Sequence, residues 1–302
     1  MSTLPNLKIL PFGGAGAVQD PDQLAKIQDI KIDLSTVLND DTITHRFLEQ
    51  YRNWIQSTQF NQVQGFEQFP HACYTNATTE AFDKFYLKNH TRRFRCFRGE
   101  YMYHILSWRN CFPNWCYIDQ DDLRSGDAMV ISYPFADTGD KHGEMDRVLS
   151  LCEAMEIPVL LDCAYMGICS GLDINLTWSC ITDVTFSMSK SFPLSHARIG
   201  MRVTRHDDDD PLFVLNKTNY TNRLGAYLGH ELLQAFGPDY IPTRYRDRQH
   251  QWCEHLGATA SPTVIFGLGD QRWKDYDRGA GNHRLCFNKY LGSGNLPQSH
   301  AL

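Results

Sequence analysis

The 302-residue chain lacks several features that would place it in a specialised class. Its ten cysteines include no CxxC pair and no zinc-site spacing, so we expect reduced, mostly buried thiols and no metal site. No apolar run approaches the length of about 18 residues that a membrane span needs. The N-terminal stretch has no basic segment followed by an apolar one. We therefore expect a cytoplasmic protein without a membrane partner.

The chain also lacks a strong charge of either sign. Its formal net charge of −6 and pI near 6.0 provide no general basic field, and no local basic patch is evident, so a nucleic-acid partner is not expected. The hydrophobic share of 42% is enough to bury a sizeable core in one large domain, alone or with a small one. A small-molecule partner is the remaining expectation.

The middle third of the chain alternates short apolar runs with a helical pattern. Strands are predicted at 128–132, 158–161 and 184–187, with a helix at 141–155 between the first two. Such alternation is typical of crossover units, so the prediction is an α/β fold whose large domain has a mostly parallel sheet flanked by helices.

The pattern changes after the last of these strands. Two helices are predicted at about 213–236 and 240–256, followed by apolar runs at 263–268 and 285–287. We interpret this part as a small C-terminal α+β subdomain. The predicted division is an N-terminal segment at 1–40 near the active site, a large domain at 41–210 and the small subdomain at 211–302.

Two ionisable residues follow predicted strands and would meet at one edge of a parallel sheet. Asp162 follows the apolar run PVLL, where a buried carboxylate is costly unless it is paired. Lys190 follows the next strand, and a partly desolvated lysine near other cations becomes nucleophilic toward carbonyl groups. Most lysines are solvated surface residues, and a structural cap is an equal alternative for Asp162.

Two further segments indicate an anion site. Arg198 offers a fork of donors suited to a phosphate, and Ser187 adds a hydroxyl. Upstream, YTNATTEAFDKF places Thr78 or Thr79 as a candidate N-cap of a helix whose free N–H groups attract a phosphate. Helix starts of this kind are common, so the segment is weak evidence alone.

Together these residues resemble the fold-type I pyridoxal-phosphate enzymes, and most closely the aminotransferases related to aspartate aminotransferase (class I/II). TNATTEA looks like the phosphate-cup segment TxGxTEA, and DCAY at 162–165 looks like the cofactor-anchoring Asp-x-x-Tyr. SMSKSFPLSHARIG at 187–200 looks like the stretch around the cofactor-bound lysine. HRLCF at 283–287 looks like the late strand that carries the substrate-binding arginine.

The resemblance implies a role for each catalytic residue. Lys190 would hold pyridoxal 5'-phosphate as an internal aldimine, which is a Schiff base, and would later move the proton at the substrate Cα. Asp162 would keep the pyridine nitrogen protonated. Tyr165 would hydrogen-bond the 3′ oxygen of the ring. The implied partners are an amino acid, a 2-oxo acid and a second copy of the chain in a homodimer.

The resemblance also implies which residues bind the cofactor and the substrate. Arg284 would clamp the substrate α-carboxylate in bidentate fashion. The aromatic residue that stacks on the ring is predicted to be Tyr101, with Tyr103 as the alternative. The predicted cofactor-binding set is Asn76, Ala77, Thr78, Tyr101, Asp162, Tyr165, Ser187, Lys190 and Arg198.

Two positions depart from the pattern of the family. Ala136 stands in YPFADTGD where the family has an asparagine that bonds the 3′ oxygen, so either Asp137 takes this role or Tyr165 acts alone. Ala77 replaces the glycine of the phosphate cup.

Transamination is the leading prediction, and other reactions at Cα stay open as alternatives, namely those of a lyase, decarboxylase, racemase or oxidase. A catalytically silent module of the same fold is a second alternative. A dinucleotide-binding role for PFGGAGAVQD at 11–20 is rejected because no convincing strand precedes it. That glycine-rich segment is expected to lie at the entrance of the active site.

Overall fold

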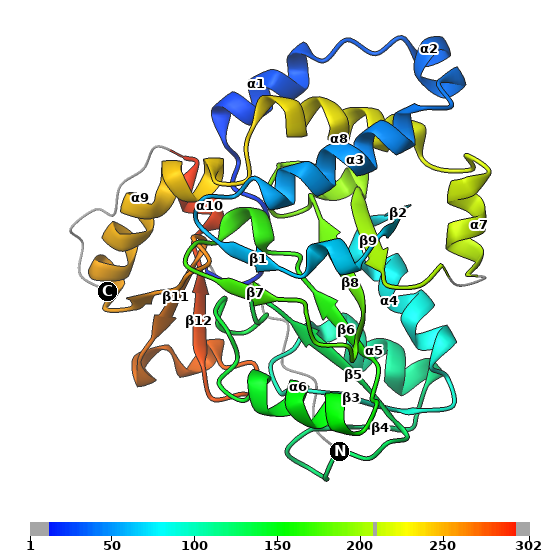
Figure 1. Cartoon of the computed structure of the whole chain (residues 1–302). Helices are drawn as coiled ribbons and strands as arrows, with labels where there is room; N and C mark the ends of the chain where they lie inside the picture. Colours follow the sequence, from blue (N-terminus) through cyan, green and yellow to red (C-terminus); the bar gives the residue numbers. More distant parts are fainter. Residues whose placement is uncertain (1–11, 208–209, 294–302) are drawn as a thin grey trace.

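The computed structural model describes residues 12–207 and 210–293 of the chain (Figure 1). Its helices are α1 (Pro21–Asp29), α2 (Leu34–Asn39), α3 (Ile43–Gln56), α4 (Ala77–Lys88), α5 (Met102–Cys111), α6 (Met145–Ala154), α7 (Pro211–Lys217), α8 (Arg223–Ala235), α9 (Tyr240–Leu256) and α10 (Asn288–Leu291). Short 3₁₀ turns are η1 (Phe66–Gln68), η2 (Met166–Ile168), η3 (Ser195–Ala197) and η4 (Gln271–Tyr276).

A seven-stranded sheet forms the centre of the molecule. In spatial order its strands are β2 (His71–Thr75), β9 (Gly200–Thr204), β8 (Ile181–Ser187), β6 (Val159–Asp162), β5 (Asp127–Ser132), β3 (Arg93–Cys96) and β4 (Trp115–Tyr117). The five strands from β8 to β4 are parallel, and β9 runs antiparallel to both of its neighbours. The prediction of a mostly parallel sheet flanked by helices is confirmed.

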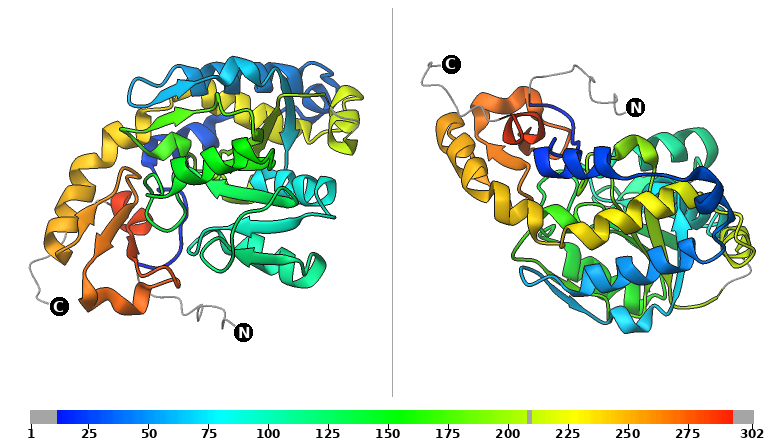
Figure 2. Two further views of the ribbon diagram at one scale, coloured as in Figure 1. Left: turned by 60° about the horizontal axis from the view of Figure 1, so that its bottom comes forward. Right: turned by 90° about the horizontal axis from the view of Figure 1, so that it is seen from above.

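Both faces of this sheet are buried, because successive side chains of a strand point to opposite faces. Met129 and Ile131 of β5 pack in one cluster with residues of α3, α6 and α8. Ala128 and Val130 of the same strand pack in another cluster with residues of α4 and α5. Helices on both faces leave the strand ends as the accessible edge of the sheet (Figures 1 and 2).

A second, smaller sheet lies beside the large one. Its antiparallel strands are β10 (Thr259–Ala260), β11 (Phe266–Gly269) and β12 (His283–Cys286). They pack with α9 and α10 in a separate hydrophobic cluster (Figure 1). Two further strands, β1 (Gln62–Gln64) and β7 (Asp173–Asn175), form a parallel pair of their own.

The domain boundaries at 1–40, 41–210 and 211–302 stay a prediction, and residues 1–11 and 294–302 lie outside the described residues. In the structure α8 lies along α3, and its buried residues join the cluster of the large sheet (Figure 2). Residues of α9 and of the elements after it join the cluster of the small sheet.

One predicted helix is wrong in its extent. The single helix expected at 213–236 is two helices, α7 and α8, because Asn219 takes a positive φ of 59° that interrupts the helix. Asn222 then caps the second helix, where its side-chain oxygen accepts from the Gly225 N–H at 2.9 Å.

All ten cysteines are unpaired, and eight of them are buried. Within residues 12–207 and 210–293, no helix is both long and apolar enough to cross a membrane.

Candidate active site

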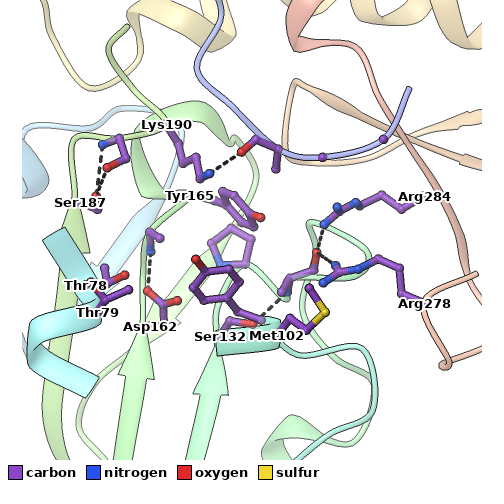
Figure 3. A pocket seen from close by; sticks show the side chains of 18 of the residues that line it. Thr78, Thr79, Met102, Ser132, Asp162, Tyr165, Ser187, Lys190, Arg278 and Arg284 are labelled. Atoms are coloured by element: carbon purple, nitrogen blue, oxygen red, sulfur yellow. Dashed lines mark hydrogen bonds between the residues drawn. The ribbon is translucent and has the colours of Figure 1, made fainter. Parts of the chain in front are cut away.

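A cavity of about 300 Å³ lies at the carboxyl edge of the large sheet, facing the small sheet (Figure 3). The parallel strands β5, β6 and β8 end at Ser132, Asp162 and Ser187, so these side chains arrive at the same edge. Nine of the ten predicted site residues line the cavity. They are Ala77, Thr78, Tyr101, Asp162, Tyr165, Ser187, Lys190, Arg198 and Arg284.

Lys190 lies just after β8, and its side chain extends into the cavity (Figure 3). Its Nζ donates to the carbonyl oxygen of Ala15 at 2.5 Å. Burial lowers the pKa of the Lys190 ammonium, since the charged form is poorly solvated there. A lysine in this state is closer to the neutral amine that attacks carbonyl carbons.

Asp162 ends β6, and only 5% of it is exposed. Its Oδ1 accepts from the Ala164 N–H at 3.1 Å. Burial, together with the nearby Glu100 carboxylate, raises the pKa of Asp162 to about 7. One hydrogen bond does not offset the cost of burying an ionised carboxylate. A cationic hydrogen-bond donor would therefore be a favourable partner for Asp162.

The part of the cavity formed by the start of α4, Arg198 and Ser187 is suited to an anion. The twelve-residue helix α4 begins there, and its first N–H groups have no acceptor within the helix. Arg198 lies beside this helix start, with its Nη2 donating to Thr79 Oγ1 at 3.1 Å. Ser187 and Ser189 add hydroxyl groups that are 2.9 Å apart. Thr75 Oγ1 is buried without a partner next to this site.

Close packing at the start of α4 explains the glycine at position 200. A Cβ atom on Gly200 would lie 2.8 Å from the Ala77 Cα and 2.8 Å from the Phe186 carbonyl oxygen. Ala77 itself has a φ of 59°, which is the left-handed region that favours glycine. The alanine that departs from the family pattern is therefore at a position with backbone strain.

Ala77→Gly is expected to raise the free energy of unfolding by about 1 kcal/mol, because glycine takes this conformation without the Cβ penalty. Urea unfolding measures the change. Ala81, a buried residue in the interior of α4, is the matched control, and Ala81→Gly should destabilise the protein. A loss of stability from both substitutions would show that Ala77 carries no relievable strain.

Asn76 is the predicted site residue that the structure does not bring to the cavity. It is the N-cap of α4, and its backbone N–H and side-chain amide both donate to the Glu80 carboxylate, at 2.7 and 3.1 Å. The expectation that Thr78 or Thr79 caps the helix is wrong, because the N-cap is Asn76, two or three residues earlier. Glu80 is thereby occupied at the helix start, and it is not among the residues that line the cavity.

The structure distinguishes the two candidate tyrosines. Tyr101 lines the cavity, whereas the hydroxyl group of Tyr103 donates to the Asp83 carboxylate at 2.9 Å. Tyr165 also lines the cavity and packs edge-on against the Phe266 ring, with 5.3 Å between the ring centroids.

Ala136 lines the cavity at the position where the family has asparagine. Its N–H donates to Ser132 Oγ at 2.8 Å. Asp137 does not line the cavity. It is fully buried, and its carboxylate accepts from the Asn282 amide at 3.0 Å. This geometry gives no support to a shift of Asp137 into the role of the asparagine.

Sequence reasoning missed Glu100, whose carboxylate lies behind the cavity. It is 4% exposed and accepts from both the N–H and the hydroxyl group of Ser132, at 2.8 and 2.5 Å. Ser132 pairs with Asp162 across the sheet, so the two carboxyl groups belong to neighbouring strand ends. A glutamate in a loop is normally solvated, and only the packing of 97–101 against β5 reveals its burial.

Glu100 should make the stability of the cofactor-free protein depend on pH. Burial raises the pKa of Glu100 to about 7, above its ordinary value of 4.5, so the folded protein binds more protons than the unfolded chain between these values. The free energy of unfolding therefore falls as pH rises from 4.5 to 7, by about 3 kcal/mol.

Urea unfolding at several pH values tests this. Glu100→Gln should remove the part of the pH dependence that Glu100 contributes, while the part from Asp162 remains, so the variant should gain stability relative to the wild type as pH rises. Glu144, an exposed glutamate, supplies the control Glu144→Gln. A constant difference between wild type and Glu100→Gln across this pH range would contradict the expectation.

Sequence reasoning also missed Arg278, which lines the cavity beside Arg284 (Figure 3). It lies in the loop between η4 and β12, where no periodic pattern marks it. Gly13, Gly14 and Ala15 complete the wall from the N-terminal side, in agreement with an entrance position for that segment.

No model of a protein family matches the chain, and no curated protein matches it in sequence. Solved structures do resemble it. The structure of MppP soaked with the product 2-ketoarginine has a TM-score of 0.66 at 11% identity, covering 91% of this chain and 94% of that chain. A probable N-succinyldiaminopimelate aminotransferase from Thermus thermophilus has a TM-score of 0.61 at 15% identity, covering 91% and 89%.

The pyridoxal-phosphate-bound C–S lyase from Staphylococcus hominis is a third similar structure. Its TM-score is 0.60 at 10% identity, and the match covers 87% of this chain and 78% of that chain. At such low identity the likeness shows the fold. The chain has the architecture of the fold-type I pyridoxal-phosphate-dependent transferases, as the sequence motifs predicted.

Proposed function

We propose that this protein, with its fold-type I architecture, is a pyridoxal-phosphate-dependent aminotransferase acting on an L-amino acid. The observation that carries the proposal is the meeting of Lys190, Asp162 and Arg198 at one cavity on the carboxyl edge of the sheet. A partly buried amine, a buried carboxyl group and an anion site are the three groups that this cofactor requires.

The residues present fit the cofactor. Its phosphate would be held by Arg198, Ser187, Thr78 and the free N–H groups at the start of α4. Asp162 would accept a hydrogen bond from the protonated ring nitrogen, which supplies the cationic partner that the buried carboxyl group lacks.

Two tyrosines would bind the ring. Tyr101, on the cavity wall, would stack on it, and the hydroxyl group of Tyr165 would bind its 3′ oxygen. The bound cofactor supplies an electron-accepting ring for the electron pair that remains when a bond at the substrate Cα breaks.

Lys190 would perform two functions. At rest its Nζ would be bonded covalently to the aldehyde carbon of the cofactor, and its lowered pKa favours that bond. As a free amine, Lys190 would take up and return the proton at the substrate Cα. Arg284 would hold the α-carboxylate, which orients the substrate for this transfer.

Other reactions at Cα are the alternative within the same fold, as the C–S lyase among the similar structures illustrates. The same lysine and aspartate support elimination, decarboxylation or oxidation, depending on which Cα bond is aligned with the ring. A catalytically silent module is less favoured, because Lys190, Asp162 and Arg198 line one cavity.

We also propose that the protein acts as a cytoplasmic homodimer. Tyr101 lines the cavity and is nevertheless 43% exposed, so a second copy would have an open side of the site to cover. Light scattering coupled to gel filtration tests the oligomeric state, and a monomer would contradict this part of the proposal.

Borohydride reduction of protein purified with pyridoxal phosphate tests the proposed function. Mass spectrometry should find a reduced pyridoxyl adduct on Lys190, and absorbance should shift toward the pyridoxamine form when an amino acid substrate is added. A screen of amino acids then identifies the substrate and the reaction type together. A colourless protein without an adduct would favour the silent module.

A further inference from the structure

Two guanidinium groups converge on one backbone oxygen in the cavity wall (Figure 3). Nη1 of Arg284, on β12, donates to the carbonyl oxygen of Ala136. Nη1 of Arg278 donates to the same oxygen at 3.2 Å. Both side chains line the cavity, so a ligand there would meet two arginines rather than the single one expected from the sequence.

The carbonyl oxygen of Ala136 cannot accept from all the N–H donors of the two arginines. A carbonyl oxygen has two lone pairs and no charge, whereas each guanidinium has five N–H donors. Arg284 is only 7% exposed, and its Nε is buried without a partner. Burial and the neighbouring Arg284 charge lower the pKa of the Arg278 guanidinium. The wall therefore has the donors and the charge for an anion with two oxygens.

The net charge of the part of the cavity wall formed by Arg278 and Arg284 suits a ligand with one carboxylate. Asp137 Oδ1 lies 3.7 Å from Arg278 Nη1, so the carboxylate of Asp137 offsets one of the two positive charges. The buried Glu100 carboxyl group also interacts with the Arg278 charge, and burial raises its pKa to about 7, so below that pH it is mostly neutral and one net positive charge is left for the ligand.

The other charged groups of the cavity leave no cation for a second acidic group. Among the described residues that line it, the remaining cations are Lys190 and Arg198, which the proposed function assigns to the cofactor. The remaining acidic residues are Asp162, Asp275 and Asp277. Asp275 and Asp277 are exposed at the rim, where they would repel a negatively charged substrate side chain.

We propose that Arg278 and Arg284 bind the substrate α-carboxylate together, and that the substrate side chain carries no negative charge. This inference rests on the proposed function, and it adds a specificity-determining residue and a substrate class to it. Aspartate and glutamate would be poor substrates, since the cavity offers their second carboxylate no cationic partner.

Binding of two unreactive acids tests the proposal by calorimetry on the protein loaded with pyridoxal phosphate. The probes are 4-methylpentanoate, with one carboxylate, and glutarate, with two. The wild type should bind 4-methylpentanoate about tenfold or more tightly than glutarate. Arg278→Gln and Arg284→Gln should each weaken 4-methylpentanoate binding by about tenfold or more, because each removes a charge-assisted hydrogen bond. Arg272→Gln, on the exposed side of η4, should leave binding unchanged.

Two results would overturn the proposal. If glutarate binds more tightly and Arg278→Gln removes only that preference, Arg278 binds a second acidic group. If Arg278→Gln leaves 4-methylpentanoate binding unchanged, Arg278 serves only as a structural partner of Asp137. Arg278→Lys keeps the charge, and its melting temperature and binding separate a loss of recognition from a loss of fold. The borohydride adduct on Lys190 reports the proposed function independently, so the two failures are distinguishable.

Discussion

Lys190→Ala should abolish the cofactor absorbance band and the adduct found after borohydride reduction, and should lower the rate of reaction by about 10³-fold or more. The substitution removes the covalent attachment and the group that moves the proton, and general acid–base catalysis alone contributes about 10² to 10⁴-fold. Absorbance, mass spectrometry and steady-state kinetics measure the three effects.

The fold should survive this substitution. The partly buried ammonium of Lys190 has one hydrogen bond, to Ala15, and desolvation lowers its pKa, so the folded protein gains little from the charge. A primary amine such as methylamine added to the Lys190→Ala protein should restore part of the activity. Lys141→Ala, at an exposed lysine, should keep the band and the rate. A Lys190→Ala protein with an intact band and rate would place the reactive amine elsewhere.

Asp162→Asn should lower the rate by about 10² to 10³-fold and weaken cofactor binding, while the cofactor-free protein becomes more stable. The amide cannot offer a negative charge to the protonated ring nitrogen, and the loss of one oriented electrostatic partner has effects of this size. Asparagine keeps the acceptor for the Ala164 N–H, so local structure is preserved.

Asp162→Asn should raise the free energy of unfolding while it lowers the rate. Because the two effects run in opposite directions, a loss of rate cannot be explained by a loss of fold. Burial raises the pKa of Asp162 from 3.8 to about 7, so above pH 7 the ionised carboxylate costs the folded protein up to about 4 kcal/mol. The advantage of Asp162→Asn in urea unfolding should therefore shrink as pH falls toward 4. Asp146→Asn, at an exposed residue, is the control. Parallel losses of stability and rate would mean that Asp162 is structural.

Three of the seven strands of the large sheet were predicted, because their burial is visible in the sequence. The predicted runs at 128–132, 158–161 and 184–187 correspond to β5, β6 and β8, since a parallel strand covered on both faces is rich in apolar residues. The break at Asn219 was not predictable from periodicity, because the helical pattern continues on both sides of it.

The candidate site was predictable where a residue of suitable chemistry follows a recognisable buried strand. Asp162, Ser187 and Lys190 follow buried strands, and nine of the ten predicted residues line the cavity. Asn76 was predicted to lie in the site because it belongs to the TNATTEA motif. In the structure its side-chain amide donates to the Glu80 carboxylate at the helix start. Local bonds of this kind depend on backbone conformation that a motif does not specify.

By itself, the sequence determined the alternation of strands and helix in the middle of the chain, the sheet edge where the ionisable residues lie and the residues that the cofactor motifs name. These depend on apolar periodicity and on residue type, which are local properties. Only the tertiary structure decided that Glu100 lies buried beside Ser132 and that Arg278 joins Arg284 at the oxygen of Ala136. Both arise from segments far apart in the chain, and the burial and charge of such groups depend on packing around them, which no local pattern records.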